Sequence, residues 1–424
     1  MTLRTEPSVE VLAPARSFPP LRLNPLRAVV RSLLQRLRCG SLQIELPDGE
    51  RLLSRGALPG PDATLRLHRW RPLWRLLTQG DLGLATSYRD GDWSTPDLVA
   101  LLRVGAANDA AWQGTLQGWA PWRAAARLLH RAHANTRRGS RQNIAFHYDL
   151  GNAFYAQWLD AGMQYSSGLY ETDRHVIPAS SRDTAQSLEE AQAAKLNLVL
   201  DLLDVQIGHR VLEIGCGWGG LAALIAHCRA HVTGLTLSQE QLAHAQQRAA
   251  AEGVADRVDL RLQDYRDVQG QYDRIVSIEM LEAVGEGYWP DYFRVLRERL
   301  APGGHAVLQV ITIGEEWFET YREGADFIQR FIFPGGMLPT RGALREQAEA
   351  AGLVLEECVQ FGDSYARTLA EWRQRFLANW RAIEALGFDA KFKRLWEYYL
   401  CYCEAGFGSG RIDVGLYRVG PGQR

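Results

Sequence analysis

The sequence lacks three features that would place it in other classes of protein. It has no uninterrupted apolar run of about 18–20 residues, so no segment is predicted to cross a membrane as a helix. Its N-terminus lacks the charged-then-apolar layout of a signal peptide, so we expect no export. Only six cysteines occur in 424 residues, and none forms a CxxC pair. We therefore expect a cytoplasmic protein with reduced thiols and no metal site.

Lysine is absent from the first 140 residues, which carry 20 arginines and 11 acidic residues. This part has a net charge of +9 and the remainder has −10, so the overall −1 conceals an asymmetry. A basic part on an acidic body predicts contact with something anionic, and both lipid headgroups and nucleic acid fit. A solvated, arginine-rich surface without a partner would give the same counts.

Length and composition divide the chain into an arm and two domains. Residues 1–24 hold several prolines without periodicity, which predicts a disordered arm. Residues 25–138 are expected to form a small, basic α+β domain. It should contain a hairpin over residues 40–53, a loop over residues 84–93 and a helix that begins after Thr95. Its first segment, residues 25–37, has the pattern of an amphipathic helix that either packs on its own domain or lies on a membrane surface.

In residues 139–424, β-rich runs alternate with helical segments. The predicted strands are residues 210–214, 231–237, 258–262, 272–278, 305–313, 353–360 and 412–419, and a long helix is predicted over residues 188–203. This alternation with short loops predicts an α/β fold with a doubly wound, mainly parallel sheet.

The segment VLEIGCGWGG, residues 211–220, combines a buried strand with a glycine-rich turn. Glycine lets the backbone turn with positive φ and lets a ligand lie on the main chain, and the next helix points its N–H groups at that ligand. Glu213 ends the strand, where open α/β sheets bind ligands. With Gly215 and Gly217 it predicts a nucleoside ligand such as S-adenosylmethionine (SAM).

The second and third strands supply the other expected cofactor contacts. Dinucleotide-binding folds carry an acid at the end of the second strand for the ribose diol, but none stands here. We therefore expect the sugar to contact Thr236 and Gln241. Gln263 and Asp264, which follow the third strand, are expected to contact the adenine edge.

A long insertion over residues 314–340 is rich in aromatic and apolar side chains. Long insertions in a compact sheet usually serve function. We expect this one to form a wall over the carboxyl edge of the sheet and to make the reaction pocket apolar.

Ordered sequence blocks resemble those of the cyclopropane-fatty-acyl-phospholipid synthases and the related mycolic acid methyltransferases. The blocks include HYDLGNAFY, MQYSSGLYE, VLEIGCGWGG, YDRIVSIEMLEAVG, FIFPGGMLP, SYARTL and YYLCYCEAGF, spread over residues 141–419. The resemblance implies a class I SAM methyltransferase that acts on a cis double bond in a phospholipid acyl chain. It also implies peripheral membrane contact and no nucleic-acid partner, and it leaves room for a homodimer.

The resemblance assigns site residues by position. Glu282 matches the family's active-site glutamate, and Tyr365 matches its active-site tyrosine. Cys403 matches a cysteine of the family pattern, which would be either a nucleophile or an inert buried thiol. Tyr165 and Ser166 match SAM contacts. In the family, methyl transfer leaves a carbocation, and a bound bicarbonate is implied as the base that closes the ring.

Three positions depart from the family pattern. Ser167 stands in place of a cysteine, and Ala283 and Ile311 stand in place of histidines. Gln309, two residues before Ile311 on the same strand face, is the expected substitute. Because these changes fall on the expected bicarbonate site, two alternatives to a cyclopropane product stay open. One is a methylene- or methyl-branched chain, and the other is a non-catalytic lipid-binding protein.

Overall fold

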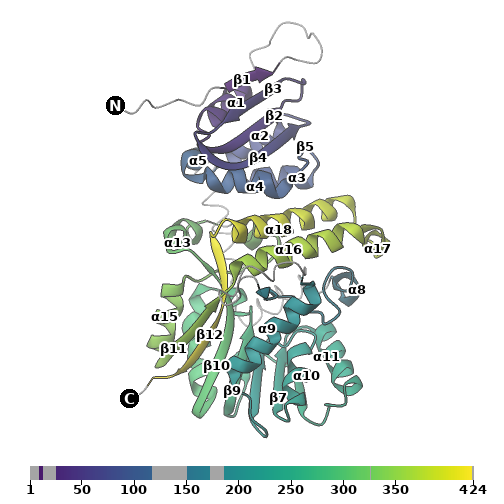
Figure 1. Cartoon of the computed structure of the whole chain (residues 1–424), viewed down its shortest axis with the longest axis vertical. Helices are drawn as coiled ribbons and strands as arrows, with labels where there is room; N and C mark the ends of the chain where they lie inside the picture. The colour runs from purple at the N-terminus through teal and green to yellow at the C-terminus, as the bar shows by residue number, and fades with distance from the viewer. Residues whose placement is uncertain (1–8, 13–24, 117–149, 172–185, 325, 423–424) are drawn as a thin grey trace. The chain divides into compact units, whose positions relative to one another are not determined.

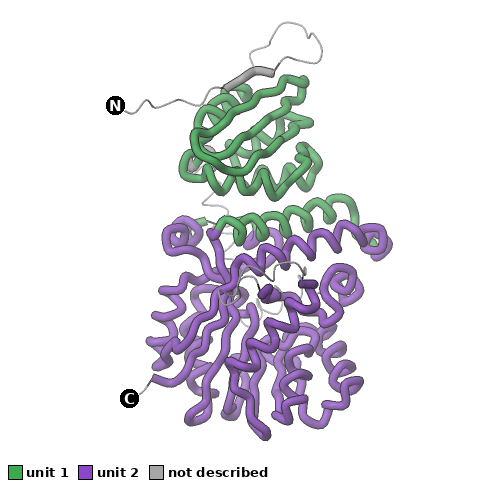
Figure 2. The backbone as a smooth tube through the Cα atoms, viewed as in Figure 1, with its two compact units in different colours: residues 1–128, 324–327, 387–409 green, residues 129–323, 328–386, 410–424 purple. Residues whose placement is uncertain are grey.

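The chain forms two compact units in a computed structural model that describes residues 9–12, 25–116, 150–171, 186–324 and 326–422. Unit 1 comprises residues 1–128, 324–327 and 387–409, and unit 2 comprises the rest (Figure 2). The expected domain boundary near residue 138 lies outside the described residues. No helix within the described ranges is long and apolar enough to span a bilayer.

The described part of unit 1 contains a five-stranded sheet in the order β1-β3-β2-β4-β5. Its strands are β1 (Val9–Leu12), β2 (Cys39–Glu45), β3 (Arg51–Arg55), β4 (Leu58–Leu67) and β5 (Trp93–Ser94). Its helices are α1 (Pro25–Gln35), α2 (Arg71–Gln79), α3 (Asp81–Arg89), α4 (Leu98–Ala107), α5 (Asp109–Leu116) and α18 (Ala390–Gly408). β2 and β3 form the expected antiparallel hairpin, so the prediction of a small α+β domain is confirmed.

Unit 1 differs from the expectations at three places. Val9–Leu12 pairs with β3 as strand β1, so the disordered arm expected over residues 1–24 does not hold at these four residues. The expected loop over residues 84–93 is largely helix α3, which buries Leu82, Ala85 and Tyr88. Burial of these side chains outweighs the turn signals around Gly91. Helix α4 is capped by Asp97, whose carboxylate accepts from the Ala100 N–H, and not by Thr95.

The apolar face of α1 packs inside unit 1. Val30, Leu33 and Leu34 are buried, and the Trp112 indole donates to the Leu33 carbonyl at 3.0 Å. Arg27 forms ion pairs with Asp48 and Glu50. Of the two roles considered for this helix, the structure therefore favours packing on its own domain.

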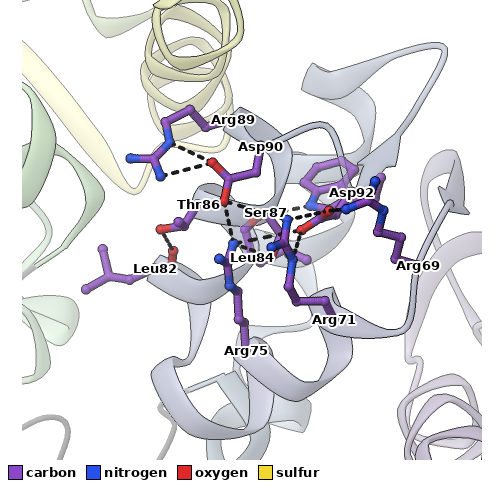
Figure 3. A network of polar contacts seen from close by, with 11 residues as sticks. Arg69, Arg71, Arg75, Leu82, Leu84, Thr86, Ser87, Arg89, Asp90 and Asp92 are labelled. Carbon is purple, nitrogen blue, oxygen red and sulfur yellow. Dashed lines mark hydrogen bonds and ion pairs between the residues drawn. The ribbon is translucent and has the colours of Figure 1, made fainter. Parts of the chain in front are cut away.

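A network of ion pairs neutralises part of the arginine charge in unit 1 (Figure 3). Arg71 donates two hydrogen bonds to the fully buried Asp92, at 2.6 and 2.7 Å. Arg75 and Arg89 both pair with Asp90, at 2.8 and 3.0 Å. Bidentate contacts of this kind fix the arginines in place. These arginines stabilise the domain, so the positive charge open to an outside anion is smaller than the sequence count.

Unit 2 is built on a seven-stranded sheet, counted over the described residues, in the order β11-β12-β10-β9-β6-β7-β8. The strands are β6 (Arg210–Ile214), β7 (His231–Thr236), β8 (Val258–Leu262), β9 (Tyr272–Ile278), β10 (Leu300–Ile313), β11 (Leu353–Gln360) and β12 (Ile412–Pro421). β12 runs antiparallel to β10 and β11, and the other pairs are parallel. The predicted doubly wound, mainly parallel sheet is confirmed (Figure 1).

Helices cover both faces of this sheet. The helices that contact its strands are α9 (Leu188–Leu203), α10 (Gly220–His227), α11 (Gln239–Ala251), α12 (Trp289–Arg299), α15 (Arg341–Ala350) and α16 (Gly362–Ala378). Unit 2 also contains α8 (Asn152–Tyr155) and α17 (Trp380–Ala385). On β10, Ala306, Leu308 and Val310 join one core with α12 and α15. The opposite face of β10 meets α9, where His305 hydrogen-bonds the Leu202 carbonyl at 3.0 Å. Gln309 lies on this second face, because side chains alternate along a strand.

The insertion over residues 314–340 holds α13 (Glu315–Arg322) and α14 (Phe327–Phe331). Its last part lies against the end of β10, where the Ile313 N–H donates to the Pro339 carbonyl at 3.0 Å. The Met337 N–H donates to the Glu282 carbonyl at 2.8 Å, and the Met337 side chain is buried. This part of the insertion therefore borders the carboxyl edge of the sheet, as expected.

Candidate active site

The glycine turn after β6 has the geometry of a ligand cradle. Gly215, Gly217 and Gly219 all have positive φ, at 84°, 51° and 81°. The Gly215 and Cys216 N–H groups donate to the Leu235 carbonyl at 2.9 and 2.8 Å, which holds the turn against β7. A Cβ on Gly215 would meet the Met280 side chain at 3.3 Å. The turn therefore lies next to the segment that follows β9.

A buried carboxylate and a buried lysine accompany this turn. Glu213 is 3% exposed, and its Oε2 has no hydrogen-bond partner among the described residues. Burial raises the pKa of Glu213 to about 8, against the opposing charge of Lys195. Burial also lowers the pKa of Lys195 to about 8, against the charges of Glu279, Asp160 and Glu213. An unpartnered buried oxygen is costly, so Glu213 is suited to accept from a ligand hydroxyl.

The remaining expected SAM contacts surround the same edge. The Thr236 hydroxyl donates to Gln241 Oε1 at 2.9 Å, and both side chains are buried. The Gln263 N–H donates to the Thr236 carbonyl at 3.1 Å. Both carboxylate oxygens of Asp264 accept from Arg266, at 2.8 and 2.6 Å, so this carboxylate is held by an arginine. The glycine turn, Glu213 and the hydrogen-bonded pair Thr236–Gln241 together suit the binding of a nucleoside.

Hydrogen bonds from three separate segments converge on the carboxylate of Glu279, directly after β9. Its Oε2 accepts from the Tyr365 hydroxyl at 2.6 Å. Its Oε1 accepts from Gln309 Nε2 at 2.7 Å and from the Ser167 N–H at 2.9 Å. Burial raises the pKa of Glu279, while these donors and Lys195 act in the opposite direction. The structure thus brings together Ser167, Gln309 and Tyr365, all three of which were expected at the site.

Glu282 lies three residues further on, in a different environment. Its Oε1 accepts from the Ile311 N–H, and its buried Oε2 has no partner within the described part of the chain. Burial and the charge of Glu279 raise the pKa of Glu282 to about 8. Both effects favour the neutral form of the Glu282 carboxyl group. The Tyr365 hydroxyl donates to Glu279, three positions before Glu282.

Residues 165–167 link the two halves of the site. The Lys195 ammonium donates to the Ser166 hydroxyl at 2.8 Å. The Ser167 hydroxyl donates to the Gly168 carbonyl at 2.8 Å, so only its backbone N–H faces Glu279. The Tyr165 ring lies 5.4 Å from Trp372, which in turn lies 6.0 Å from the Tyr365 ring. These rings form an aromatic wall beside the Glu279 carboxylate.

Cys403 lies on α18, which belongs to unit 1, and its expected role stays a prediction. No cluster of potential metal ligands occurs in the described residues.

Two functional candidates escaped the sequence analysis. Glu279 stands directly after the buried strand YDRIVSI, at the sheet edge where ligands bind, and this position was the available signal. Lys195 lies on the buried face of helix α9, on the same side as the buried residues Gln192 and Val199. A lysine on a buried helix face is rare unless it is paired, which was a second signal.

Comparison with known proteins agrees with this geometry. Residues 135–416 match the family model described as mycolic acid cyclopropane synthetase. The tuberculostearic acid methyltransferase UfaA1 of Mycobacterium tuberculosis is 40% identical over 372 residues, which cover 86% of each chain. The cyclopropane-fatty-acyl-phospholipid synthase of Escherichia coli K12 is 38% identical over 354 residues, or 81% of this chain and 84% of that one.

A solved structure extends the likeness to three dimensions. The mycolic acid cyclopropane synthase CmaA1, complexed with SAH and CTAB, is 31% identical and has a TM-score of 0.60. The match covers 66% of this chain and 98% of that one.

The sheet order, the glycine turn and these similarities define a class I SAM-dependent methyltransferase. The chain belongs to the mycolic acid cyclopropane synthetase family, whose members modify fatty acyl chains.

Proposed function

We propose that this protein transfers the methyl group of SAM to the cis double bond of an unsaturated phospholipid acyl chain and releases a methylene-branched chain. The observation that carries the proposal is the convergence of Tyr365, Gln309 and Ser167 on one buried carboxylate beside the glycine turn. A proton acceptor that is shielded from water suits the end of an alkene methylation, because the carbocation must lose a proton before water reacts with it.

The residues around the cluster suit the first step as well. An alkene is a weak nucleophile, so the methyl donor must be held in line with it. We expect the glycine turn, Glu213 and the pair Thr236–Gln241 to hold the donor. The faces of Tyr165, Trp372 and Tyr365 are suited to stabilise the developing cation through the ring quadrupole.

Similarity to the tuberculostearic acid methyltransferase supports a branched product over ring closure. A cyclopropane is the second candidate, because the synthase of Escherichia coli is 38% identical over most of both chains. Both products retain one added CH₂, so they have the same mass. A saturated methyl branch would need a hydride donor in a separate reaction.

The substrate class implies that the protein works at a membrane surface, and we propose peripheral binding at the inner face. Unit 1, with its excess of arginine, is the part that would contact anionic lipid.

The direct test incubates the purified full chain with SAM and vesicles of unsaturated phospholipid. We expect formation of SAH and a modified acyl chain whose proton NMR spectrum shows exocyclic methylene signals. Upfield ring-proton signals would instead identify the cyclopropane. Binding of SAM without turnover of any unsaturated phospholipid would refute the proposed activity and favour a non-catalytic lipid-binding protein.

A further inference from the structure

The Glu279 carboxylate occupies the centre of the polar cluster in which a bicarbonate ion was expected. Ser167 and Gln309 were expected at the bicarbonate site and Tyr365 as the family's active-site tyrosine, and each donates a hydrogen bond to Glu279. A carboxylate and a bicarbonate present the same planar pair of oxygens to such donors. The residues present therefore do not fit a second anion, because its donors are engaged and its charge would face Glu279 at close range.

The hydrogen-bond geometry leaves Glu279 able to accept a proton. An ionised carboxylate has about four acceptor positions, and three are used by donors from the described residues. Oε2 accepts only the bond from Tyr365 in this set, so it retains a lone pair. Burial raises the pKa of Glu279, which makes it a stronger base than an exposed glutamate.

Glu279 is also held at the correct end of the sheet. Its backbone lies in the left-handed region, at φ 48°, which is unusual for a residue other than glycine. Its N–H donates to the Gln309 carbonyl at 2.8 Å, which fixes this conformation. The next residue, Met280, lies against Gly215 of the cofactor turn. The residue next to Glu279 thus borders the expected cofactor turn, and its carboxylate accepts a hydrogen bond from Tyr365 of the aromatic wall.

We propose that Glu279 is the general base of the reaction, a built-in carboxylate that acts where relatives would use a bound bicarbonate. This proposal rests on the proposed function. In the first step the S–CH₃ bond of SAM breaks, a C–C bond forms from the alkene electron pair, and SAH leaves with the sulfur electrons. The acyl chain then carries a cation on the carbon adjacent to the methylated carbon.

Glu279 acts in the second step. For the branched product, a hydride moves from the methylated carbon to its neighbour, and Glu279 Oε2 then removes a proton from the methyl group. The C–H electron pair becomes the exocyclic C=C bond. For a cyclopropane there is no hydride shift, and the same electron pair closes the ring. Both endings need one base at the methyl carbon, and neither needs an oxidant or a reductant.

The first experiment depletes bicarbonate. The wild-type protein is assayed with SAM and unsaturated phospholipid vesicles in buffer freed of CO₂, with and without added bicarbonate. We expect the rate to be unchanged within about twofold. A large loss of activity that added bicarbonate restores would overturn the proposal, because the ion would then be the base. A wild-type protein with no activity under any condition would instead refute the proposed function.

The second experiment removes the base. Glu279→Gln keeps the size of the side chain, and we expect kcat to fall by about 10²–10³-fold, as for loss of a general base. SAM affinity, measured by calorimetry, should change little and would report any misfolding. With SAM deuterated in the methyl group, the kinetic isotope effect should increase, because proton removal becomes rate-limiting. An unchanged kcat in this variant would contradict the proposal.

The third experiment separates a base from a positioning residue. Glu279→Gly suits the left-handed backbone and leaves a carboxylate-sized space. We expect added formate, acetate or bicarbonate to restore part of its activity with saturation. Glu286→Gln, which changes a surface ion pair with Arg322, is the matched control and should show neither loss nor rescue. Absence of rescue together with an unchanged isotope effect in Glu279→Gln would assign Glu279 a structural role.

Discussion

At the scale of single residues, two glutamates three positions apart differ because their surroundings differ. Glu279 accepts three hydrogen bonds, whereas Glu282 accepts one backbone N–H and keeps a buried oxygen without a partner among the described residues. Donors stabilise the charged form of Glu279, and their scarcity leaves Glu282 neutral up to a pKa of about 8. Burial raises the pKa of both carboxyl groups, and the three donors oppose this rise more strongly at Glu279.

This difference predicts how stability depends on pH. Folding raises the pKa of Glu282 from 4.5 to about 8, so the folded chain binds an extra proton in that window. Its contribution to the free energy of unfolding is therefore present below pH 4.5 and is lost as pH rises to about 8. Glu282→Gln mimics the neutral acid, so we expect it to match the wild type at pH 5 and to be more stable by about 1–3 kcal/mol at pH 8. Denaturant unfolding at both pH values measures this, and equal stabilities at pH 8 would contradict it.

Tyr365 should set the basicity of Glu279. Its hydroxyl stabilises the ionised carboxylate, so Tyr365→Phe should raise the pKa of Glu279 further. We expect the acidic limb of the kcat–pH profile to move to higher pH, and kcat at pH 7 to fall about tenfold. The other titratable groups near Glu279 are Lys195 and Glu282, which the substitution leaves in place. Tyr272→Phe is the control that should leave the profile unchanged, because the Tyr272 hydroxyl donates to the Gln269 carbonyl at 3.2 Å.

Sequence reasoning found the members of this cluster but not its centre. Ser167, Gln309 and Tyr365 were identified from ordered blocks, whereas Glu279 was passed over in favour of Glu282. The sequence does not reveal which of two nearby acids a distant tyrosine contacts, because Tyr365 lies 86 positions from Glu279 and the fold decides the pairing. The position of Glu279 at the end of a buried strand was the usable clue.

At the scale of elements, periodicity predicted the sheet of unit 2 and missed one helix of unit 1. Strands buried on both faces have long apolar runs, and glycine turns mark their ends, so the strands of unit 2 were recognisable. Helix α3 escaped because residues 84–93 carry Gly91 and three neighbouring polar residues that favour a turn. The helix forms because Leu82 and Tyr88 are buried in the folded domain. The local sequence pattern carries no information about this burial.

The turn before α10 allows a matched pair of substitutions. Gly219 has φ 81°, and a Cβ there would meet the Ala245 Cβ at 2.7 Å. Gly253 has φ 70° with nothing within 4 Å of such a Cβ. Both alanine variants carry the backbone strain of about 1 kcal/mol, but only Gly219→Ala adds a clash at the cofactor turn.

We therefore expect Gly219→Ala to lose about 2–4 kcal/mol of stability and at least tenfold in SAM affinity. Gly253→Ala should lose about 1 kcal/mol and bind SAM normally. Thermal unfolding and calorimetric titration with SAM measure both quantities. Equal SAM affinities in the two variants would show that the turn does not hold the donor.

At the scale of the whole molecule, the candidate active site and the arginine excess belong to different units. Every residue of the Glu279 cluster lies in unit 2. Unit 1 carries the arginine excess, but Arg71, Arg75 and Arg27 are committed to internal ion pairs. Because these ion pairs hold several arginines against acidic residues of the same unit, we expect apolar contact to add to electrostatic attraction if unit 1 binds a membrane.

Trp74 is the side chain in unit 1 best suited to that contact. It lies on α2, whose Leu73 and Leu76 are buried, yet Trp74 itself is 62% exposed. Tryptophan favours the boundary between water and lipid because its ring is apolar and its N–H is polar. We expect Trp74→Ala to weaken binding to vesicles of anionic, unsaturated phospholipid by about tenfold, with little change in thermal stability. Ile207→Ala, which removes a 73% exposed apolar side chain in unit 2, is the control and should bind as the wild type does. Vesicle co-sedimentation at low and high salt measures both variants, and equal binding of Trp74→Ala and the wild type at each salt concentration would exclude this helix as the lipid contact.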